Sequence, residues 1–149
     1  MADLDFDVVS LPETDHVSAG ETAPDFTRPL VTSEFWEDRS LTDLAAEGPI
    51  LLAFHSMDGA FPATYLYKQL KTRALEDEYD VSIVGVSIST PYEHKRLLRE
   101  RDVDYRLFSD PANAVAREYG LDHDLDGMTG ISEPRPAFVL VNEDRTVLW

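Results

Sequence analysis

Three short apolar runs, separated by segments with helical periodicity, set the strongest limit on the fold of this chain. The runs cover residues 50–54, 81–89 and 136–141 and are bounded by turn-forming residues, a pattern typical of buried strands. Residues 61–79 place apolar side chains three and four positions apart, which predicts an amphipathic helix. Strands that alternate with helices favour a mostly parallel sheet that is covered on both faces and ends in a hairpin.

Shorter segments with their own start and stop signals complete the alternation. Ser40 or Thr42 is placed to cap a helical turn, and Asp110-Pro111 has the residue types of a helix start. The segment 91–101 predicts a helix with a strongly basic face. The further expected elements are a helical turn over 40–44, a helix over 91–101, a strand over 105–108, a helix over 110–119 and an antiparallel edge strand over 146–149.

The length of 149 residues favours one domain. We expect an acidic, loose lead-in over residues 1–19 and the folded domain over 20–149. The first ten residues contain three Asp and no Lys or Arg, which excludes a secretory signal. No apolar stretch approaches the roughly 18 residues of a membrane span. These features predict a cytoplasmic protein with no membrane partner.

The charge balance is strongly acidic, with 29 acidic and 13 basic residues and a net charge of −16. Such a field repels nucleic acid and anionic lipid, so neither is expected as a partner. Self-repulsion destabilises a fold at low salt and is mostly screened at about 1 M salt, where the Debye length is about 3 Å. Together with the scarcity of lysine, this balance favours a halophilic source.

Cysteine is absent from the whole sequence. Its absence excludes disulfides, thiolate metal sites and thiol catalysis by this chain itself. We also expect no cofactor.

Five local patterns, in the same order, resemble the peroxiredoxins, the alkyl hydroperoxide reductase and thiol-specific antioxidant family. The resemblance runs from about residue 20 to Trp149 and implies an α/β fold of the thioredoxin-like, peroxiredoxin type, with a central mixed sheet flanked by helices. The patterns are Ala-Pro-Asp-Phe at 23–26, the helical turn and strand at 41–53, Ser-Ile-Ser-Thr-Pro-Tyr-Glu-His-Lys at 87–95, Leu-Phe-Ser-Asp at 107–110 and Pro-Arg-Pro-Ala-Phe-Val-Leu-Val at 134–141.

The resemblance places the family's active-site motif between the first strand and the long helix. That motif is Pro, three residues, Thr, two residues, Cys, and its positions fall on Ser56, Ala60 and Ala63. Arg135 falls where the family keeps the arginine that activates the thiolate. A peroxidatic cysteine attacks peroxide as a thiolate, and alanine has no nucleophilic atom. We therefore expect a degenerate site without thiol peroxidase activity.

Part of the site remains able to bind a ligand. The start of the helix at 60–64 offers free backbone N–H groups, and the resemblance aims Arg135 at it. With His55 and Thr64, these groups predict a pocket for a small anion or another polar ligand. In the alternative interpretation, Arg135 only pairs with a nearby carboxylate and His55 is an ordinary, partly buried histidine.

An Asp-rich loop forms a second candidate site. Asp122, Asp124, Asp126 and Glu133 match the spacing of a calcium-binding loop. Such a loop needs an exiting helix, whereas prolines and a strand follow here, so the resemblance makes this segment a surface loop.

Three functions therefore stay open. The first is a peroxiredoxin-like protein without catalysis, which acts as a binding or interaction module, forms a homodimer and binds an unknown protein partner. The second is an antioxidant oxidoreductase that works through a partner's thiol. The third is a metal-binding module at the Asp122–Glu133 loop. The basic face of residues 91–101 either docks an acidic partner or is a solvated face that pairs with local acids.

Overall fold

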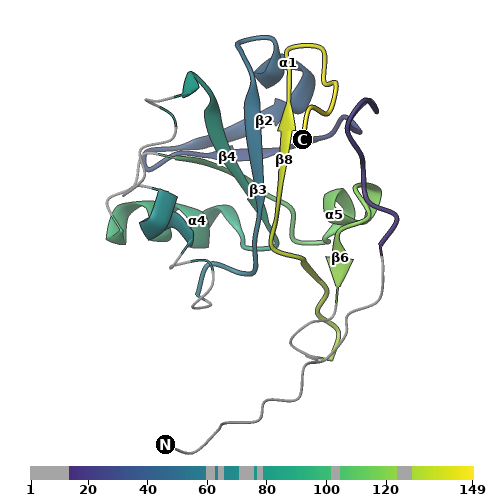
Figure 1. Ribbon diagram of the computed structural model, residues 1–149. Coiled ribbons are helices and arrows are strands. Elements are labelled where there is room, and N and C mark those ends of the chain that lie inside the picture. The colour runs from purple at the N-terminus through teal and green to yellow at the C-terminus, as the bar shows by residue number, and fades with distance from the viewer. Residues whose placement is uncertain are drawn as a thin grey trace, which may run out of the picture.

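A mixed β-sheet with six strands dominates the computed structural model, which describes residues 14–59, 63, 66–70, 76, 79–101, 105–123 and 129–149 (Figure 1). The strand order is β2-β1-β5-β4-β3-β8. The parallel centre consists of β3 (Ile50–Phe54), β4 (Ser82–Ser87) and β5 (Arg106–Ser109), and β8 (Ala137–Val141) runs antiparallel to β3. This arrangement confirms the expected α/β class with a central mixed sheet.

The other edge of the sheet is a hairpin that the sequence did not predict. It consists of β1 (Thr27–Val31) and β2 (Trp36–Ser40), and β1 also pairs antiparallel with β5. Both strands lack a continuous apolar run, because β1 contains Arg28 and Pro29 and β2 is largely charged. Tertiary pairing, of β1 with β5 and of β2 with β1, therefore fixes them as strands, rather than local propensity.

Two of the expected helices form where their caps predict. Ser40 accepts the Asp43 N–H at 3.0 Å and starts α1 (Leu41–Ala45). Thr90 and Glu93 form a reciprocal capping box at the start of α4 (Pro91–Glu100). Residues 63, 66–70, 76 and 79 are helical, in agreement with the helix expected over 61–79, and the rest of that prediction lies outside the described residues.

The helix expected from Asp110 is shorter than predicted. It begins only at α5 (Ala114–Glu118), because Asn113 adopts a left-handed conformation with φ of 56° and leaves Pro111 in a turn. Asp110 still caps it, since its Oδ2 accepts the Val115 N–H at 2.8 Å. Two-residue strands β6 (Asp122–His123) and β7 (Glu133–Pro134) then form a small separate ladder.

Each face of the sheet has its own hydrophobic core. One core joins β3 and β4 to α1 and α5, and the other joins the opposite face to the helical residues Tyr67 and Leu70 and to Leu97 and Leu98 of α4. The C-terminal segment returns along β8, where Leu140 N–H donates to Trp149 O at 2.8 Å, so the expected antiparallel edge is confirmed. Among the described residues, no helix has the length and apolarity to cross a membrane.

Candidate functional site

Buried polar side chains gather beyond the carboxyl ends of the parallel strands, where ligands bind in open α/β sheets. Within the described part of the chain, the buried polar and charged residues are His55, Asp58, Ser87, Ser89, His94, Ser109, Asp110, Asn113 and Glu133. A polar group buried without a hydrogen bond is destabilising, so the partners of each group decide its role.

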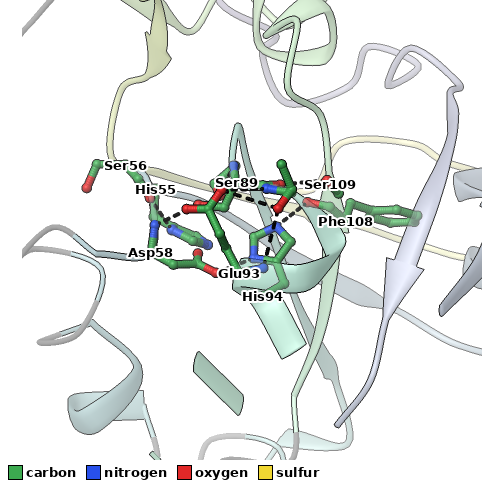
Figure 2. A network of polar contacts seen from close by, with 10 residues as sticks. His55, Ser56, Asp58, Ser89, Glu93, His94, Phe108 and Ser109 are labelled. Carbon is green, nitrogen blue, oxygen red and sulfur yellow. Dashed lines mark hydrogen bonds and ion pairs between the residues drawn. The ribbon is translucent and has the colours of Figure 1, made fainter. Parts of the chain in front are cut away.

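His94 and Asp58 form the centre of this layer. Figure 2 shows the His94 ring beside Asp58, with Nδ1 of the ring 2.7 Å from Asp58 Oδ2 and Nε2 3.1 Å from the carbonyl of Phe108. A carbonyl oxygen only accepts, so Nε2 carries a hydrogen, and Nδ1 is bonded to the Asp58 carboxyl group. Both ring nitrogens are therefore used within the protein, and neither faces a ligand.

Serine hydroxyls connect this pair to the strand ends. Ser89 Oγ accepts the Asp58 N–H at 2.8 Å, and Ser109 Oγ donates to the Ser89 carbonyl at 2.6 Å (Figure 2). Ser87 Oγ accepts the Ser89 N–H at 3.2 Å. The turn after β3 is thus tied to the loop after β4 and to β5 by bonds that are internal to the fold.

His55 follows β3 and differs from His94 in its bonding. Its Nδ1 lies 2.6 Å from the carbonyl of Ser56, so Nδ1 carries the hydrogen and Nε2 is the acceptor. Burial lowers the pKa of His55 to about 4, against the opposing attraction of Asp58. The imidazole is therefore neutral at pH 7, and its Nε2 is buried without a hydrogen-bond partner.

The phenol of Tyr67 packs against His55, with ring centroids 5.0 Å apart and the rings perpendicular. Its hydroxyl is also buried without a hydrogen-bond partner, and burial raises its pKa well above the usual value. Gly85 of β4 makes room for this contact, because a Cβ there would overlap the Tyr67 hydroxyl and lie 3.1 Å from His55 Nε2. The three residues form a close-packed cluster on one face of the sheet.

Ala63 lies next to this cluster and is fully buried. It is helical and one helical turn before Tyr67, so both side chains occupy the same face of the helix. Ser56 is partly buried, and its Oγ has no hydrogen-bond partner. Ala60 and Thr64 lie outside the described residues. Ala63 is thus buried on the helix face that carries Tyr67, and its side chain has no reactive atom.

Arg135 follows β7 and is partly buried, and its backbone N–H donates to the Leu121 carbonyl at 2.7 Å. Glu133 is buried and its Oε2 accepts the Met57 N–H at 3.2 Å, which ties β7 to the turn after β3. The direction of the Arg135 side chain toward the helix start stays a prediction.

The calcium hypothesis concerns four carboxylates, of which Asp124 and Asp126 lie outside the described residues. Asp122 is exposed on β6, and its strand partner is Pro134. Among the described residues there is no group of three or more metal-ligating side chains. Cation binding at this loop therefore stays a prediction.

The sequence did not single out Asp58, His94, Tyr67 or Gly85 as site residues. Two features of the sequence indicate Gly85 and His94. A glycine inside an apolar strand marks a close approach of another group, as at Gly85. His94 occupies the apolar stripe of α4 with Leu97 and Leu98, and a histidine at such a position is buried. The pairing of Asp58 with His94 spans 36 positions and has no local signal.

The mixed sheet, the helical residues Ala63 and 66–70 after β3 and the polar layer at the strand ends define a thioredoxin-like α/β protein of the peroxiredoxin type. The profile of the AhpC/TSA family matches residues 19–149, and the chain belongs to that family. It does so without the cysteine on which the peroxide chemistry described above depends.

Three known proteins illustrate the relationship. The chain is 29% identical over 117 residues to the chloroplastic peroxiredoxin Q of Gentiana triflora, covering 74% of this chain and spanning half the length of that relative. The peroxidoxin BcpB of Mycobacterium tuberculosis superposes with a TM-score of 0.76 at 27% identity, over 89% of this chain and 84% of that one. Enterococcus faecalis AhpC has the same fold, with a TM-score of 0.75 at 18% identity, over 88% and 78% of the two chains.

Proposed function

We propose that this chain is a member of the AhpC/TSA family that has lost catalysis and acts as a binding or interaction module. The observation that carries the proposal is Ala63, a fully buried residue without a nucleophilic atom at the position where the family resemblance puts the reactive cysteine. No other residue of the sequence supplies a thiol. Both ring nitrogens of His94 are bonded within the fold, and His55 Nε2 is buried, so neither histidine takes the place of a thiolate.

Two features support a binding role. Polar atoms of the turn after β3, His55 Nε2, Ser56 Oγ and Asp58 Oδ1, are buried without partners in this structure. An open cleft of about 330 Å³ lies between Asp58-Gly59 and the exposed side of α4. That volume is within the range of small-molecule sites, which begins at about 300 Å³. Of the residues with unpartnered atoms, Asp58 lines this cleft. A neutral His55 accepts a hydrogen bond, so it suits a ligand with a donor group that reaches past Asp58, while Arg135 and Thr64 are the proposed partners of an anionic group.

A peroxide-consumption assay with a dithiol reductant tests the loss of catalysis. We expect the rate with purified protein to equal the rate with a heat-denatured control. Turnover clearly above that control would contradict the proposal and favour the antioxidant function. Turnover that appears only when a second protein with a reactive thiol is added would favour the function in which the chain works through a partner's thiol.

A series of variants tests which positions caused the loss. Ala63→Cys alone should restore little activity, because burial beside a neutral histidine does not lower the pKa of a thiol. The triple change Ser56→Pro, Ala60→Thr and Ala63→Cys returns the family residues and should be faster than Ala63→Cys. Equal rates for the two would show that the neighbouring positions are unimportant.

We also propose that the protein is a cytoplasmic homodimer adapted to high salt. The support is the family membership together with the net charge of −16. Light scattering after size-exclusion chromatography at low and high KCl gives the mass directly. A monomer at both salt concentrations would refute the dimer, and stability that does not rise with KCl would refute the salt adaptation.

A further inference from the structure

A local group of basic residues lies on α4 and at its C-terminal end. Of the 13 Lys and Arg residues in the chain, four lie between positions 95 and 101. They are Lys95, Arg96, Arg99 and Arg101. A local excess of positive charge on a protein of net charge −16 sets this surface apart from its surroundings.

Exposed aromatic rings lie on the same surface. Tyr92 is 73% exposed on the first turn of α4, and Phe35 is 55% exposed in the turn between β1 and β2. The rings of Tyr92 and Trp36 meet edge to face at 5.0 Å, and Lys95 Nζ lies 5.8 Å from the centre of the Trp36 ring. Tyr, Trp and Arg are the residues that most often dominate binding energy at protein interfaces.

The arginines of this surface are held in place by one nitrogen each. Arg96 Nε donates to Glu100 Oε1 at 2.9 Å, and Arg99 Nε donates to the Ser33 carbonyl at 2.8 Å. Within the described part of the chain, their terminal nitrogens make no hydrogen bond, and the Arg96 side chain is 78% exposed. A guanidinium oriented in this way presents its remaining donors to a carboxylate with little further loss of side-chain entropy.

The turn that carries Phe35 is also well ordered by its own bonds. Thr32 Oγ1 accepts the N–H groups of Glu34 and Phe35, and Arg99 ties the neighbouring Ser33 to α4. The surface therefore needs little rearrangement to bind, which favours affinity because the ordering cost is already met.

We propose that these residues form a docking surface for an acidic segment of another protein, in which carboxylates alternate with apolar side chains. Carboxylates of the partner pair with the terminal nitrogens of Arg96 and Arg99, and its apolar groups cover Tyr92 and Phe35. Glu34, Glu93 and Glu100 border the surface and disfavour a partner of high negative charge density such as a nucleic acid. We name the set Phe35, Trp36, Tyr92, Lys95, Arg96 and Arg99 the Tyr92 surface.

The proposal gives the interaction role one specific surface and to that extent rests on the proposed function. The loss of catalysis and the docking surface can be refuted separately. The peroxide assay tests the site around Ala63, and peptide binding tests the Tyr92 surface. Peroxide turnover would refute the loss of catalysis and leave the docking surface standing.

The test is a calorimetric titration of the full chain with a short synthetic peptide. In this peptide, glutamate alternates with leucine and phenylalanine. We expect saturable binding that weakens with added salt. Tyr92→Ala and Arg96→Glu should each weaken it by roughly tenfold or more, the scale of a side chain central to an interface. Matched controls are Tyr79→Ala and Arg117→Glu, which change an exposed tyrosine and an exposed arginine elsewhere and should leave the affinity within about twofold.

Four results would overturn the proposal. One is the absence of saturable binding, and another is binding that all four variants weaken equally. The third is preferential binding of a single-stranded oligonucleotide or of a second copy of the chain; self-association through this surface would be seen as a lower mass for Tyr92→Ala than for the wild type. The fourth is binding of a peptide with lysine in place of glutamate, which would show that charge recognition is absent.

Discussion

The two histidines at the carboxyl end of the sheet are only 6.3 Å apart, yet they differ in how their nitrogens are bonded. His94 uses both nitrogens, on Asp58 and on the Phe108 carbonyl, and belongs to a network of serines that holds the strand ends together. His55 leaves Nε2 without a partner, next to the equally unpartnered hydroxyl of Tyr67. The region around His94 has the properties of structural support, although Asp58 Oδ1 within it has no partner. The incompletely bonded region around His55 and Tyr67 lies one helical turn from Ala63, where the family resemblance puts the reactive residue.

Removing His94 should have the largest effect on stability. His94→Ala leaves the Asp58 carboxylate buried beside a cavity, and loss of one partner of a buried pair costs about 3–5 kcal/mol. Urea denaturation at pH 7 measures the difference in unfolding free energy between His94→Ala and the wild type. A loss below about 1 kcal/mol, the scale of a surface pair, would show that the bond to Asp58 contributes little.

His55 should make the stability depend on pH over an acidic window. Its pKa is about 4 in the folded protein and about 6.5 when unfolded, so the unfolded chain binds the proton first as the pH falls. The contribution of neutral His55 to the free energy of unfolding is complete above about pH 6.5. It declines as the pH falls toward 4, and its total loss is about 3 kcal/mol.

The many carboxylates of the chain also titrate in that range, so the measurement is a difference between proteins. His55→Gln cannot take up the proton, and its unfolding free energy should fall less than that of the wild type between pH 7 and pH 4.5. Parallel pH profiles for the two proteins would mean that His55 is not buried in its neutral form.

A methyl group at Gly85 should disturb the incompletely bonded region by an intermediate amount. Gly85→Ala places its Cβ on the Tyr67 hydroxyl, and overpacking of this kind costs about 1–3 kcal/mol. Thermal unfolding measures the loss. The double variant Gly85→Ala with Tyr67→Phe lacks the clashing oxygen and should recover part of the lost stability. If the effects of the two substitutions are simply additive, the strain lies elsewhere, for example at Leu107.

Tyr67→Phe alone should have the smallest effect. The hydroxyl has no hydrogen-bond partner, so its removal loses no bond, and the expected change in unfolding free energy is within about 0.5 kcal/mol of zero. Ser109→Ala is the matched control, because that hydroxyl donates to Ser89 and its loss leaves a buried carbonyl without its donor. Equal losses in both variants would remove the distinction between the two regions.

The sequence predicted those parts of the molecule whose determinants are local. The apolar run of β3, the cap at Ser40 and the start of α4 at Pro91 all form at or within one residue of the expected positions. The β1–β2 hairpin was missed because β1 depends on pairing with β5 and β2 on pairing with β1. The predicted start of α5 at Asp110 was wrong, because the left-handed conformation of Asn113 delays the helix to Ala114.

The site was predictable only in part for the same reason. The family motif located Ser56 and Ala63 by their distance along the chain from the first strand. The contacts between Asp58 and His94 and between Tyr67 and Gly85 join different elements, and their geometry follows from the packing of helices on the sheet. The protonation of each histidine depends on those contacts and could not be inferred from residue spacing.

The charged outer strand β2 has a consequence for how this protein meets other molecules. Glu37 and Asp38 are exposed along this edge, and Arg39 pairs with Glu37 and Glu47. Charges on an outermost strand discourage another chain from adding its own strand there. At this end of the sheet, crowding in the cell should therefore not lead to fibril-like stacking, and recognition is left to the rings of Phe35 and Trp36 where the strand begins.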